Sequence, residues 1–406
     1  MTYQETLDWM FGQLPMYQRQ GQVAFKKDLT NILAFSEVLG APHKKFKTVH
    51  VGGTNGKGSS SHMLASVLQA AGYRVGLYTS PHLKDYTERI RIDGQCIEQD
   101  FVVDFIQQHK VFLEEHRLSF FEMSVGLAFA YFASKQVDVA IIEVGLGGRL
   151  DSTNIITPEL SLITNIGKDH TAILGETLEA IALEKAGIIK SQVPVVIGEF
   201  HPETHQVFEE RSLTLKAPLY WARDFELPAY IQLDLKGTYQ QGNARGVMAC
   251  VEVLKHRGWS ISNEAISKGF SQVVQRTGLR GRWEILQQAP LSIADTAHNK
   301  EGLGVVLKQL TALPHEKLHF VLGVVQDKDL SQVLPLFPKD AHYYFCAPQV
   351  PRALEAEELK SKALEFGLKG EVFTSVEEAF AAARKQSSFS DIIYVGGSTF
   401  VVAEII

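Results

Sequence analysis

The stretch that most constrains this chain is residues 49–59, VHVGGTNGKGS, where an apolar run ends in glycines and a helical pattern follows at once. Apolar residues recur three and four positions apart from Met63 to Leu68, and Gly72 ends the pattern. A strand, a glycine-rich loop and a helix in this order are typical of a phosphate site, because backbone N–H groups face the anion. We expect Lys57 to reach the outer phosphates and Ser59 to supply a hydroxyl to Mg²⁺.

This loop departs from the usual P-loop pattern, G-x-x-x-x-G-K-[ST]. Val51 stands at the position of the first glycine, and Gly58 separates Lys57 from Ser59. The alternative is a glycine-rich turn that binds no ligand. We disfavour it because Gly, Lys and Ser all fall where the strand meets the helix.

The rest of the chain alternates apolar runs with helical patterns. Val137–Val144 is almost wholly apolar, which is typical of a strand buried on both faces, and residues 160–166 form a second such run. The alternation predicts an α/β fold, with a parallel sheet covered by helices on both faces. Residues 199–235 are less regular and rich in aromatic side chains, so we expect only a peripheral region containing β structure there.

A chain of 406 residues predicts two domains. The segment 276–282, RTGLRGR, is polar and glycine-rich, and we take it as the linker. We therefore expect a P-loop-type domain over 1–278 and a smaller α/β domain over 279–406. The second domain carries no phosphate loop of its own.

Composition excludes several classes of partner. The formal net charge is −6 and no run of Lys and Arg exceeds two residues, which argues against nucleic acid. No apolar stretch approaches the roughly 20 residues that span a bilayer, and the N-terminus does not resemble a signal peptide. The three cysteines are far apart and lack metal-type spacing. We expect a cytoplasmic protein with reduced thiols and no membrane partner.

Polar residues follow the buried strands where ligands bind in open α/β sheets. Glu143 ends one strand and is a candidate Mg²⁺ ligand; alternatively it caps a helix or pairs with Arg149. His170 follows Asp169 after the next strand, and a lone histidine is more often structural than a ligand. Because neighbouring strand ends meet at one rim, we favour the ligand role for both Glu143 and His170.

Lys185 is placed unusually. It lies four and seven residues after Ile181 and Leu178, so it continues the apolar stripe of its helix. A buried ammonium needs an acid partner or a lowered pKa. A lysine beside a metal–phosphate site could instead react with CO₂ to form an anionic carbamate that binds Mg²⁺. The alternative is a side chain that extends to the helix end and pairs with an acid.

In the second half, the sequence ADTAHN places Asp295 and His298 directly after a predicted strand. This loop could bind a ribose, orient a reacting group or cap the following helix. Composition does not choose among these roles.

Together these motifs resemble the folylpolyglutamate synthase/dihydrofolate synthase branch of the Mur ligase family. The resemblance covers essentially the whole chain in order. It rests on GTNGKGS (53–59), YTSPHL (78–83), ERIRIDG (88–94), FFE (120–122), EVGLGGRLDSTN (143–154), IGKDHTAILGETLEAIALEKAGIIK (166–190), YQQGN (239–243), GRWE (281–284), DTAHN (295–299), QDKD (326–329) and GGS (396–398). One departure is GGTNGKG in place of the more usual TGTNGKG, which changes only a side chain before the loop.

The resemblance implies a P-loop domain followed by a Rossmann-like domain. It implies a ligase of folate biosynthesis and one-carbon metabolism that activates a carboxylate with ATP as an acyl phosphate. The amine of L-glutamate then attacks, giving an amide, ADP and phosphate. The implied substrates are dihydropteroate and reduced folates, and we expect a monomer.

The resemblance also implies residue roles. The ATP phosphates would be bound by Gly53, Thr54, Asn55, Gly56, Lys57, Gly58 and Ser59. One Mg²⁺ would be held by Ser80 and Glu143, and a second by His170 and a carbamylated Lys185. ATP contacts would also come from Asn243, Arg282 and Asp295, and His298 would orient the reacting groups. Pterin contacts are expected at Asp28, Phe121, Glu122 and Asp151.

Two alternatives remain at this point. One is a ligase that adds an amino acid to a cell-wall UDP-sugar precursor, which SPHL, ERI and FFE disfavour. The other is a P-loop protein that binds nucleotide as a switch and ligates nothing. Within the folate branch, the enzyme could add the first glutamate, extend the tail, or do both. The sequence DLTN (28–31) resembles bifunctional members and favours both.

Overall fold

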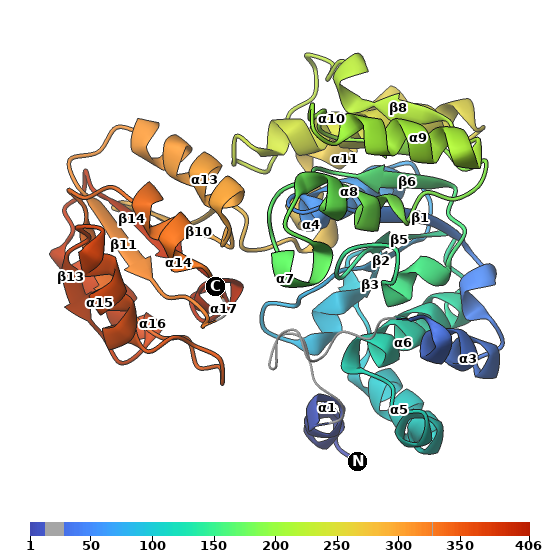
Figure 1. Ribbon diagram of the computed structural model, residues 1–406, viewed down its shortest axis with the longest axis horizontal. Coiled ribbons are helices and arrows are strands. Elements are labelled where there is room, and N and C mark those ends of the chain that lie inside the picture. The colour runs from blue at the N-terminus through green and yellow to red at the C-terminus, as the bar shows by residue number, and fades with distance from the viewer. Residues whose placement is uncertain (13–27, 327) are drawn as a thin grey trace. The chain divides into compact units, whose positions relative to one another are not determined.

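The computed structural model describes residues 1–12, 28–326 and 328–406, so Asp327 of the 326–329 motif lies outside the described residues. The chain forms two compact units (Figure 1). The first comprises residues 1–234 and 240–278, and the second comprises residues 235–239 and 279–406. The short segment 235–239 is held in the second unit by Gln309, whose side-chain oxygen accepts from Thr238 N at 2.6 Å.

The first unit is built on an eight-stranded sheet in the order β4-β3-β2-β5-β1-β6-β7-β8. The strands from β2 to β8 along this order run parallel, and β3 and β4 form an antiparallel edge. Their bounds are β1 Lys47–Gly52, β2 Val75–Tyr78, β3 Ile90–Ile92, β4 Gln95–Cys96, β5 Val139–Glu143, β6 Leu160–Ile163, β7 Val195–Ile197 and β8 Leu219–Trp221. The central strands β1, β5 and β6 are almost wholly buried, as their apolar sequences predict.

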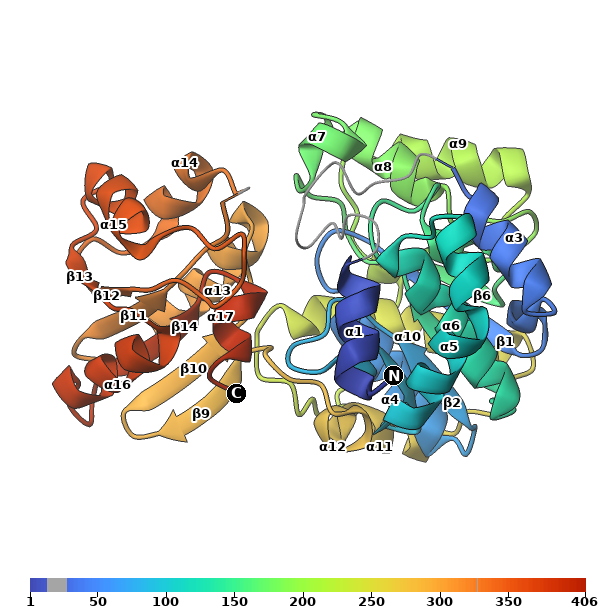
Figure 2. The same ribbon diagram turned by 90° about the horizontal axis from the view of Figure 1, so that it is seen from below.

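Helices cover both faces of this sheet (Figures 1 and 2). On one face, α4 (Lys57–Ala70) packs against β1, β2 and β5, and α10 (Gln240–His256) packs against β6 and β7. Helices α11 (Asn263–Ser271) and α12 (Val273–Thr277) pack on α4. The opposite face is covered by α1 Tyr3–Gly12, α3 Thr30–Val38, α5 Gln99–Glu115, α6 Phe120–Ser134, α8 Leu178–Ala186 and α9 His205–Leu215. The short helix α7 (Thr171–Leu174) precedes α8.

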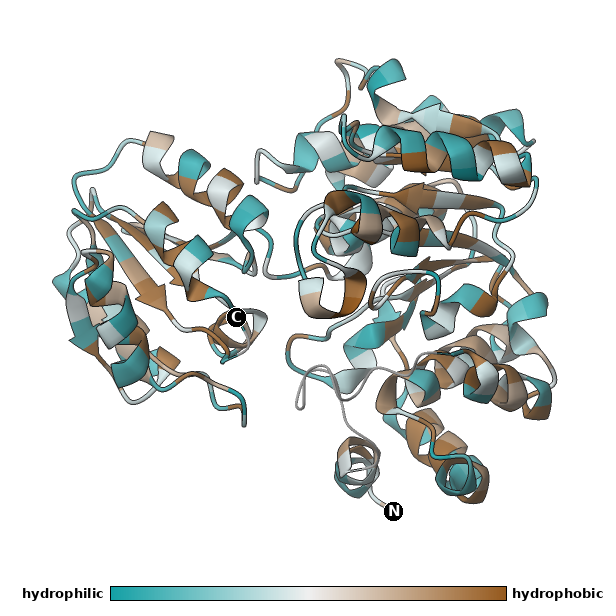
Figure 3. Ribbon diagram, viewed as in Figure 1, coloured by the Kyte–Doolittle hydropathy of each residue, from teal (hydrophilic) through white to brown (hydrophobic). Residues whose placement is uncertain are grey.

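The second unit contains a six-stranded sheet in the order β13-β12-β11-β14-β10-β9, parallel except for the edge strand β9. Its strands are β9 Glu284–Gln288, β10 Leu291–Asp295, β11 Leu318–Leu322, β12 His342–Phe345, β13 Gly370–Val372 and β14 Ile392–Gly396. One face is covered by α13 Lys300–Ala312, α14 Leu330–Val333 and α15 Ala356–Glu365, and the other by α16 Val376–Gln386 and α17 Thr399–Ala403. In Figure 3 the apolar residues concentrate in the strands of each sheet.

The predicted fold class is confirmed, since each unit has a mainly parallel sheet between helices. The prediction for residues 199–235, a peripheral region containing β structure, was incomplete. This region contains α9 and the edge strand β8, which pairs parallel with β7 and so continues the alternation. The short strand β8 is only half-buried, which explains why its pattern was indistinct. Among the described residues, no helix is long and apolar enough to cross a membrane.

Candidate active site

The loop between β1 and α4 depends on two glycines. Gly53 and Gly56 have φ angles of 141° and 82°, which residues with a side chain rarely adopt. A Cβ on Gly53 would lie 1.8 Å from Thr164 Oγ1, and one on Gly56 would lie 2.2 Å from Asn243 Oδ1. Gly56 is also the N-cap of α4 and provides no side-chain cap. The first turn of α4 therefore keeps its N–H groups available to an anion.

The segment after β6 fixes the other side of this loop. Thr54 N donates to the Asn165 carbonyl at 3.0 Å, and Asn55 N donates to Asn165 Oδ1 at 2.8 Å. The Thr54 hydroxyl also bonds the backbone of Gly167. Asn165 and Gly167 were not among the predicted site residues. The only signal was the polar ending of the buried run at 160–166.

Two lysines converge on one carbonyl oxygen of the loop. Lys57 Nζ donates to Gly53 O at 3.1 Å and to Thr54 O at 3.0 Å, and Lys185 Nζ donates to Gly53 O at 2.9 Å. Lys185 is only 4% exposed, so it does not extend to solvent. Burial, followed by repulsion from Lys57, lowers the pKa of Lys185 to about 7. The charge of Asp169 acts in the opposite direction. Lys185 is therefore partly an uncharged amine at neutral pH.

Glu143 lies beside this loop. It ends β5 and is paired in register with Val51 of β1. Its carboxylate is 3% exposed and accepts from Ser80 N at 3.3 Å. Arg149, which could have paired with Glu143, instead forms an ion pair with Glu184 at 2.7 Å. The structure thus brings together the two residues predicted to hold one Mg²⁺, Ser80 and Glu143.

His170 is the N-cap residue of α7 and adopts a left-handed backbone conformation, with φ of 51°. Its backbone N–H donates to Asp169 Oδ1 at 2.9 Å, and its Nε2 lies 3.9 Å from Asp169 Oδ2. The side chain is 29% exposed. The imidazole is therefore accessible to a ligand. The side chain lies close to Asp169, whose charge also acts on Lys185.

No group of three or more His, Cys, Asp or Glu side chains forms a metal site within residues 1–12, 28–326 and 328–406. Mg²⁺ keeps several waters and typically binds one or two carboxylates together with substrate phosphates. Glu143 at a strand end beside a phosphate loop supplies such a carboxylate. A single strand-end carboxylate of this kind suits Mg²⁺ that is bound together with a nucleotide.

The first turn of α10 contacts the loop between β1 and α4 and the first turn of α4. Asn243 lies against Gly56 and donates to Gln240 Oε1 at 2.9 Å. Gln240 in turn donates to Ser59 Oγ at 3.0 Å. The helix begins at Gln240. Gln240 was missed because its partner lies 181 positions away in the chain.

The predicted pterin contacts have structural partners of their own. Glu122 accepts from the backbone and hydroxyl of Ser119 in a capping box at the start of α6. Asp151 is buried and accepts from the backbone of Gly145, Leu146 and Thr153. Asp28 accepts from Thr30 N at 2.9 Å, and the Phe121 ring lies 6.1 Å from that of Tyr78. Of these four residues, Phe121 is the one whose side chain offers an aromatic surface.

Arg89 lies in the motif ERIRIDG (88–94) but was not among the predicted site residues. Its guanidinium is 2% exposed and lies 5.1 Å from the ring centre of Phe120. Its Nε donates to His82 Nδ1 at 2.8 Å. Burial lowers the pKa of Arg89, whereas the charge of Glu143 raises it. Arg89 is therefore a buried cation that is stabilised in part by the charge of Glu143.

In the second unit, Asp295 ends β10 and is 2% exposed. Its Oδ2 accepts from Tyr239 OH at 2.6 Å and from Trp283 N at 2.7 Å, and its Oδ1 accepts from Ala297 N at 2.8 Å. Burial raises its pKa. Asp295 does not cap α13, because Asn299 does so by accepting from Gly302 N at 2.9 Å.

Arg282 and His298 both contact Thr296, the residue after Asp295. Arg282 donates to the Thr296 hydroxyl, and His298 Nδ1 lies 2.9 Å from the Thr296 carbonyl. The three residues predicted in this unit are therefore gathered around one loop. That loop joins β10 to α13.

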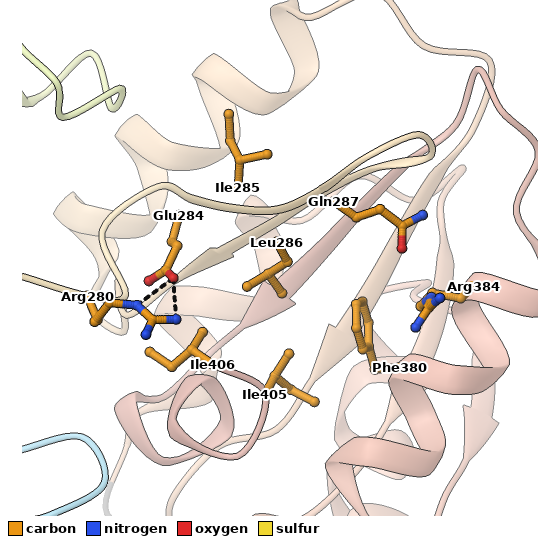
Figure 4. Close-up of a pocket in the computed structure, with 9 residues that line it drawn as sticks. All are labelled: Arg280, Glu284, Ile285, Leu286, Gln287, Phe380, Arg384, Ile405 and Ile406. Atoms are coloured by element: carbon orange, nitrogen blue, oxygen red, sulfur yellow. Dashed lines mark hydrogen bonds and ion pairs between the residues drawn. The ribbon is translucent and has the colours of Figure 1, made fainter. Parts of the chain in front are cut away.

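A pocket of about 400 Å³ opens beside β9 in the second unit (Figure 4). It is lined by Arg280, Glu284, Ile285, Leu286, Gln287, Phe380, Arg384, Ile405 and Ile406, and includes none of the predicted site residues. Glu284 pairs with Arg280 at 2.5 Å and accepts from Gly281 N at 2.7 Å. The pair therefore supports the backbone directly before Arg282.

Two protein-family models match the chain. The model described as the Mur ligase middle domain matches residues 51–212. The model described as the Mur ligase glutamate ligase domain matches residues 281–399. The first range contains the loop, Glu143 and Lys185, and the second contains Arg282, Asp295 and His298.

Characterised proteins are similar over most of their length. The dihydrofolate synthase/folylpolyglutamate synthase of Escherichia coli (strain K12) is 34% identical over 370 residues, covering 87% of this chain and 85% of that protein. The structure of Escherichia coli FolC in complex with DHPP and ADP has a TM-score of 0.86 at 30% identity, covering 100% of this chain and 97% of that chain. A bifunctional folylpolyglutamate synthase/dihydrofolate synthase with Mn, AMPPNP and L-glutamate bound has a TM-score of 0.85 at 30% identity, with the same coverage.

Proposed function

Because this chain belongs to the folylpolyglutamate synthase and dihydrofolate synthase family of Mur ligases, we propose that it joins L-glutamate to dihydropteroate and to the tail of reduced folates, using ATP. The family, the fold class and the ligase class predicted from the motifs are confirmed. The observation that carries the proposal is the convergence of Lys57 and Lys185 on the loop beside Glu143.

The chemistry requires the chain to bring two anions together. The folate carboxylate attacks the γ-phosphorus of ATP, the bond from that phosphorus to the bridging oxygen breaks, and ADP leaves. The glutamate amine then attacks the acyl carbon and phosphate leaves, with one proton lost from the amine. Lys57 would stabilise the negative charge of the transferred phosphoryl group. Bound Mg²⁺, held by Glu143 and Ser80, would add further positive charge.

We propose a second Mg²⁺ position, held by His170 and a carbamylated Lys185. Its support is the burial of Lys185 together with its pKa of about 7, because only an uncharged amine attacks CO₂. Carbamate formation would replace a cation that repels Lys57 with an anion that attracts it. The negative charge of Asp169 acts on Lys185 and would add to the attraction for a cation at this position.

We assign the phosphate contacts to residues 53–59 and Asn243 of a domain over 1–278, and further nucleotide contacts to Arg282 and Asp295 of a domain over 279–406. His298 would orient the reacting groups from the same loop. Phe121 is the best supported of the pterin contacts because its ring is partly exposed. The compact units differ from these domains in one respect: segment 235–239 belongs with the second unit.

The direct test is phosphate release from MgATP and glutamate by the purified protein, with dihydropteroate, with tetrahydrofolate and without a pterin. We expect release with both substrates. Release with dihydropteroate alone would limit the enzyme to dihydrofolate synthesis, and release with tetrahydrofolate alone to tail extension. No stimulation by either, in protein that binds ATP, would favour a cell-wall ligase or a nucleotide switch.

A further inference from the structure

His50 is a buried polar residue with no role in the proposed ligase chemistry. It lies on β1, three positions before Gly53, the first residue of the phosphate loop, and is 0% exposed. In register it is flanked by Ile142 of β5 and Ser161 of β6. An imidazole in the middle of a sheet is costly unless it is hydrogen-bonded, so its bonds indicate why it is there.

The direction of its hydrogen bond can be deduced. His50 Nε2 lies 2.9 Å from the hydroxyl of Thr153, and that hydroxyl donates its hydrogen to Asp151 Oδ1. The Thr153 oxygen must therefore accept from His50, whose proton is on Nε2. Nδ1 has no hydrogen-bond partner in the described part of the chain, and burial lowers the pKa of His50 to about 3. The ring is thus a neutral donor near pH 7.

The relay continues to the turn that follows Glu143. Asp151 uses its second oxygen to accept from Gly145 N at 3.0 Å and from Leu146 N at 2.9 Å. These are the second and third residues after Glu143. The chain His50–Thr153–Asp151 therefore ties β1 to the backbone from which the Glu143 carboxylate projects.

The same turn is attached to the helix that carries Lys185. Arg149 N donates to the Glu184 carbonyl at 2.8 Å, and Asn154 Nδ2 donates to the Gly187 carbonyl at 3.1 Å. A Cβ on Gly148 would lie 3.0 Å from Lys185 Cα, so the turn and the helix are in close contact. A change in the position of the turn would therefore affect both Glu143 and Lys185.

We propose that His50 is a positioning residue that holds Glu143 and Lys185 in register with the phosphate loop, acting through Thr153 and Asp151. The inference rests on the proposed function, because it takes these two residues as ligands of Mg²⁺. Partners behind metal ligands typically change metal affinity or activity 10- to 100-fold when removed. His50 acts through two intermediates, so we expect an effect near the lower limit.

The test compares His50→Leu, which removes the donor, with His50→Gln, whose amide nitrogen can still donate to Thr153. Mn²⁺ binding is measured by electron paramagnetic resonance in the presence of ADP, and amide hydrogen exchange is followed over residues 143–154. We expect His50→Leu to bind Mn²⁺ about tenfold more weakly and to exchange faster in this segment. We expect His50→Gln to stay within about threefold of the parent in Mn²⁺ affinity, since the donor is retained.

Two further variants make the test specific. Thr153→Val removes the relay hydroxyl without changing the side-chain shape, and should reproduce His50→Leu even if the latter folds poorly. The matched control is His319→Leu, which removes another buried histidine, bonded to Asp391 and Tyr344 in the second unit. The control should leave both measurements unchanged.

Unchanged Mn²⁺ affinity and unchanged exchange in folded His50→Leu and Thr153→Val would overturn the inference. An equal loss in His319→Leu would overturn it too, because the effect would then reflect general destabilisation. Both measurements are independent of turnover. Faster exchange in a protein that shows no glutamate-dependent phosphate release would therefore support the relay while removing the proposed function.

Discussion

Each unit contains a strand, a loop and a helix that carry predicted site residues, yet the two loops differ in kind. In β1–α4 the loop is glycine-rich, its carbonyls accept from two lysines, and the helix has no side-chain cap. In β10–α13 the Asp295 carboxylate accepts three hydrogen bonds, and Asn299 caps the helix. In the first loop, the N–H groups at the start of the helix remain available to an anion. In the second loop, the Asp295 carboxylate and the start of the helix already have hydrogen-bond partners within the protein. We therefore expect loop chemistry, rather than topology, to determine which unit binds phosphate.

The largest effect is expected from Lys185→Ala, which removes one of the two lysines that bond the first loop. We expect turnover to fall by about 10³-fold or more, because the variant loses the proposed carbamate and leaves its ligand position empty. Small carboxylates such as acetate or formate should partly restore it by substituting for the carbamate. Phosphate release with and without added carboxylate measures both effects. Full activity in Lys185→Ala would remove the carbamate from the mechanism.

Glu143→Gln tests the acidic side of the same loop. Removing one charge at nearly constant shape should lower turnover about 10²- to 10³-fold and raise the Mg²⁺ concentration needed for half-maximal rate. The measurement is a Mg²⁺ titration at saturating ATP. Glu184→Gln is a suitable control, because Glu184 pairs with Arg149 rather than facing the loop. An unchanged Mg²⁺ requirement in Glu143→Gln would assign Glu143 a structural role.

Asp295→Asn tests whether the second loop is primarily structural. The amide would place an N–H group against one of the donors that now bond the carboxylate, so we expect a loss of about 1–3 kcal/mol in the free energy of unfolding. Nucleotide affinity should fall about tenfold. Tyr239→Phe, which removes one donor only, should cost less in a denaturant titration. Unchanged nucleotide affinity would contradict the proposed contact of Asp295 with the nucleotide, whereas a stable variant with strongly impaired binding would show that the carboxylate is not primarily structural.

The pKa of Lys185 predicts a pH effect that the second loop does not share. Since the pKa is about 7, the uncharged amine grows as pH rises from 6 to 8, whereas an ordinary lysine stays almost fully protonated. Protein depleted of CO₂ should therefore recover activity severalfold more at pH 8 than at pH 6, at equal dissolved CO₂. Equal recovery at both pH values would contradict the carbamate proposal.

Replacing a glycine by alanine should have opposite effects on stability in the β1–α4 loop and in α13. Gly304 lies inside α13, and a Cβ added there would meet nothing within 4 Å among the described residues, so Gly304→Ala should stabilise the protein by about 0.5–1 kcal/mol. Gly56→Ala should destabilise it by about 1–3 kcal/mol, because the loop needs a positive φ and the space is taken by Asn243. Thermal unfolding of the two variants compares them directly. Stabilisation by Gly56→Ala would show that the loop relaxes easily.

Local sequence determined the elements and the residues that they present. The apolar run and glycines at 49–59 identified the loop, Glu143 was placed at a strand end, and the stripe containing Lys185 predicted its burial. Such inferences work because periodicity and strand ends are encoded within about ten neighbouring residues. The sequence motifs, taken together, also predicted the protein family and the class of reaction.

Only the tertiary structure decided which of these residues meet. The sheet order β5-β1-β6 brings Lys185 to the Gly53 carbonyl across 132 positions, and His50 to Thr153 across 103. The structure also shows that Asp151 accepts from three backbone N–H groups and from the Thr153 hydroxyl, which composition could not reveal. Hydrogen-bond partners so distant in sequence depend on strand order and register, which no local pattern specifies.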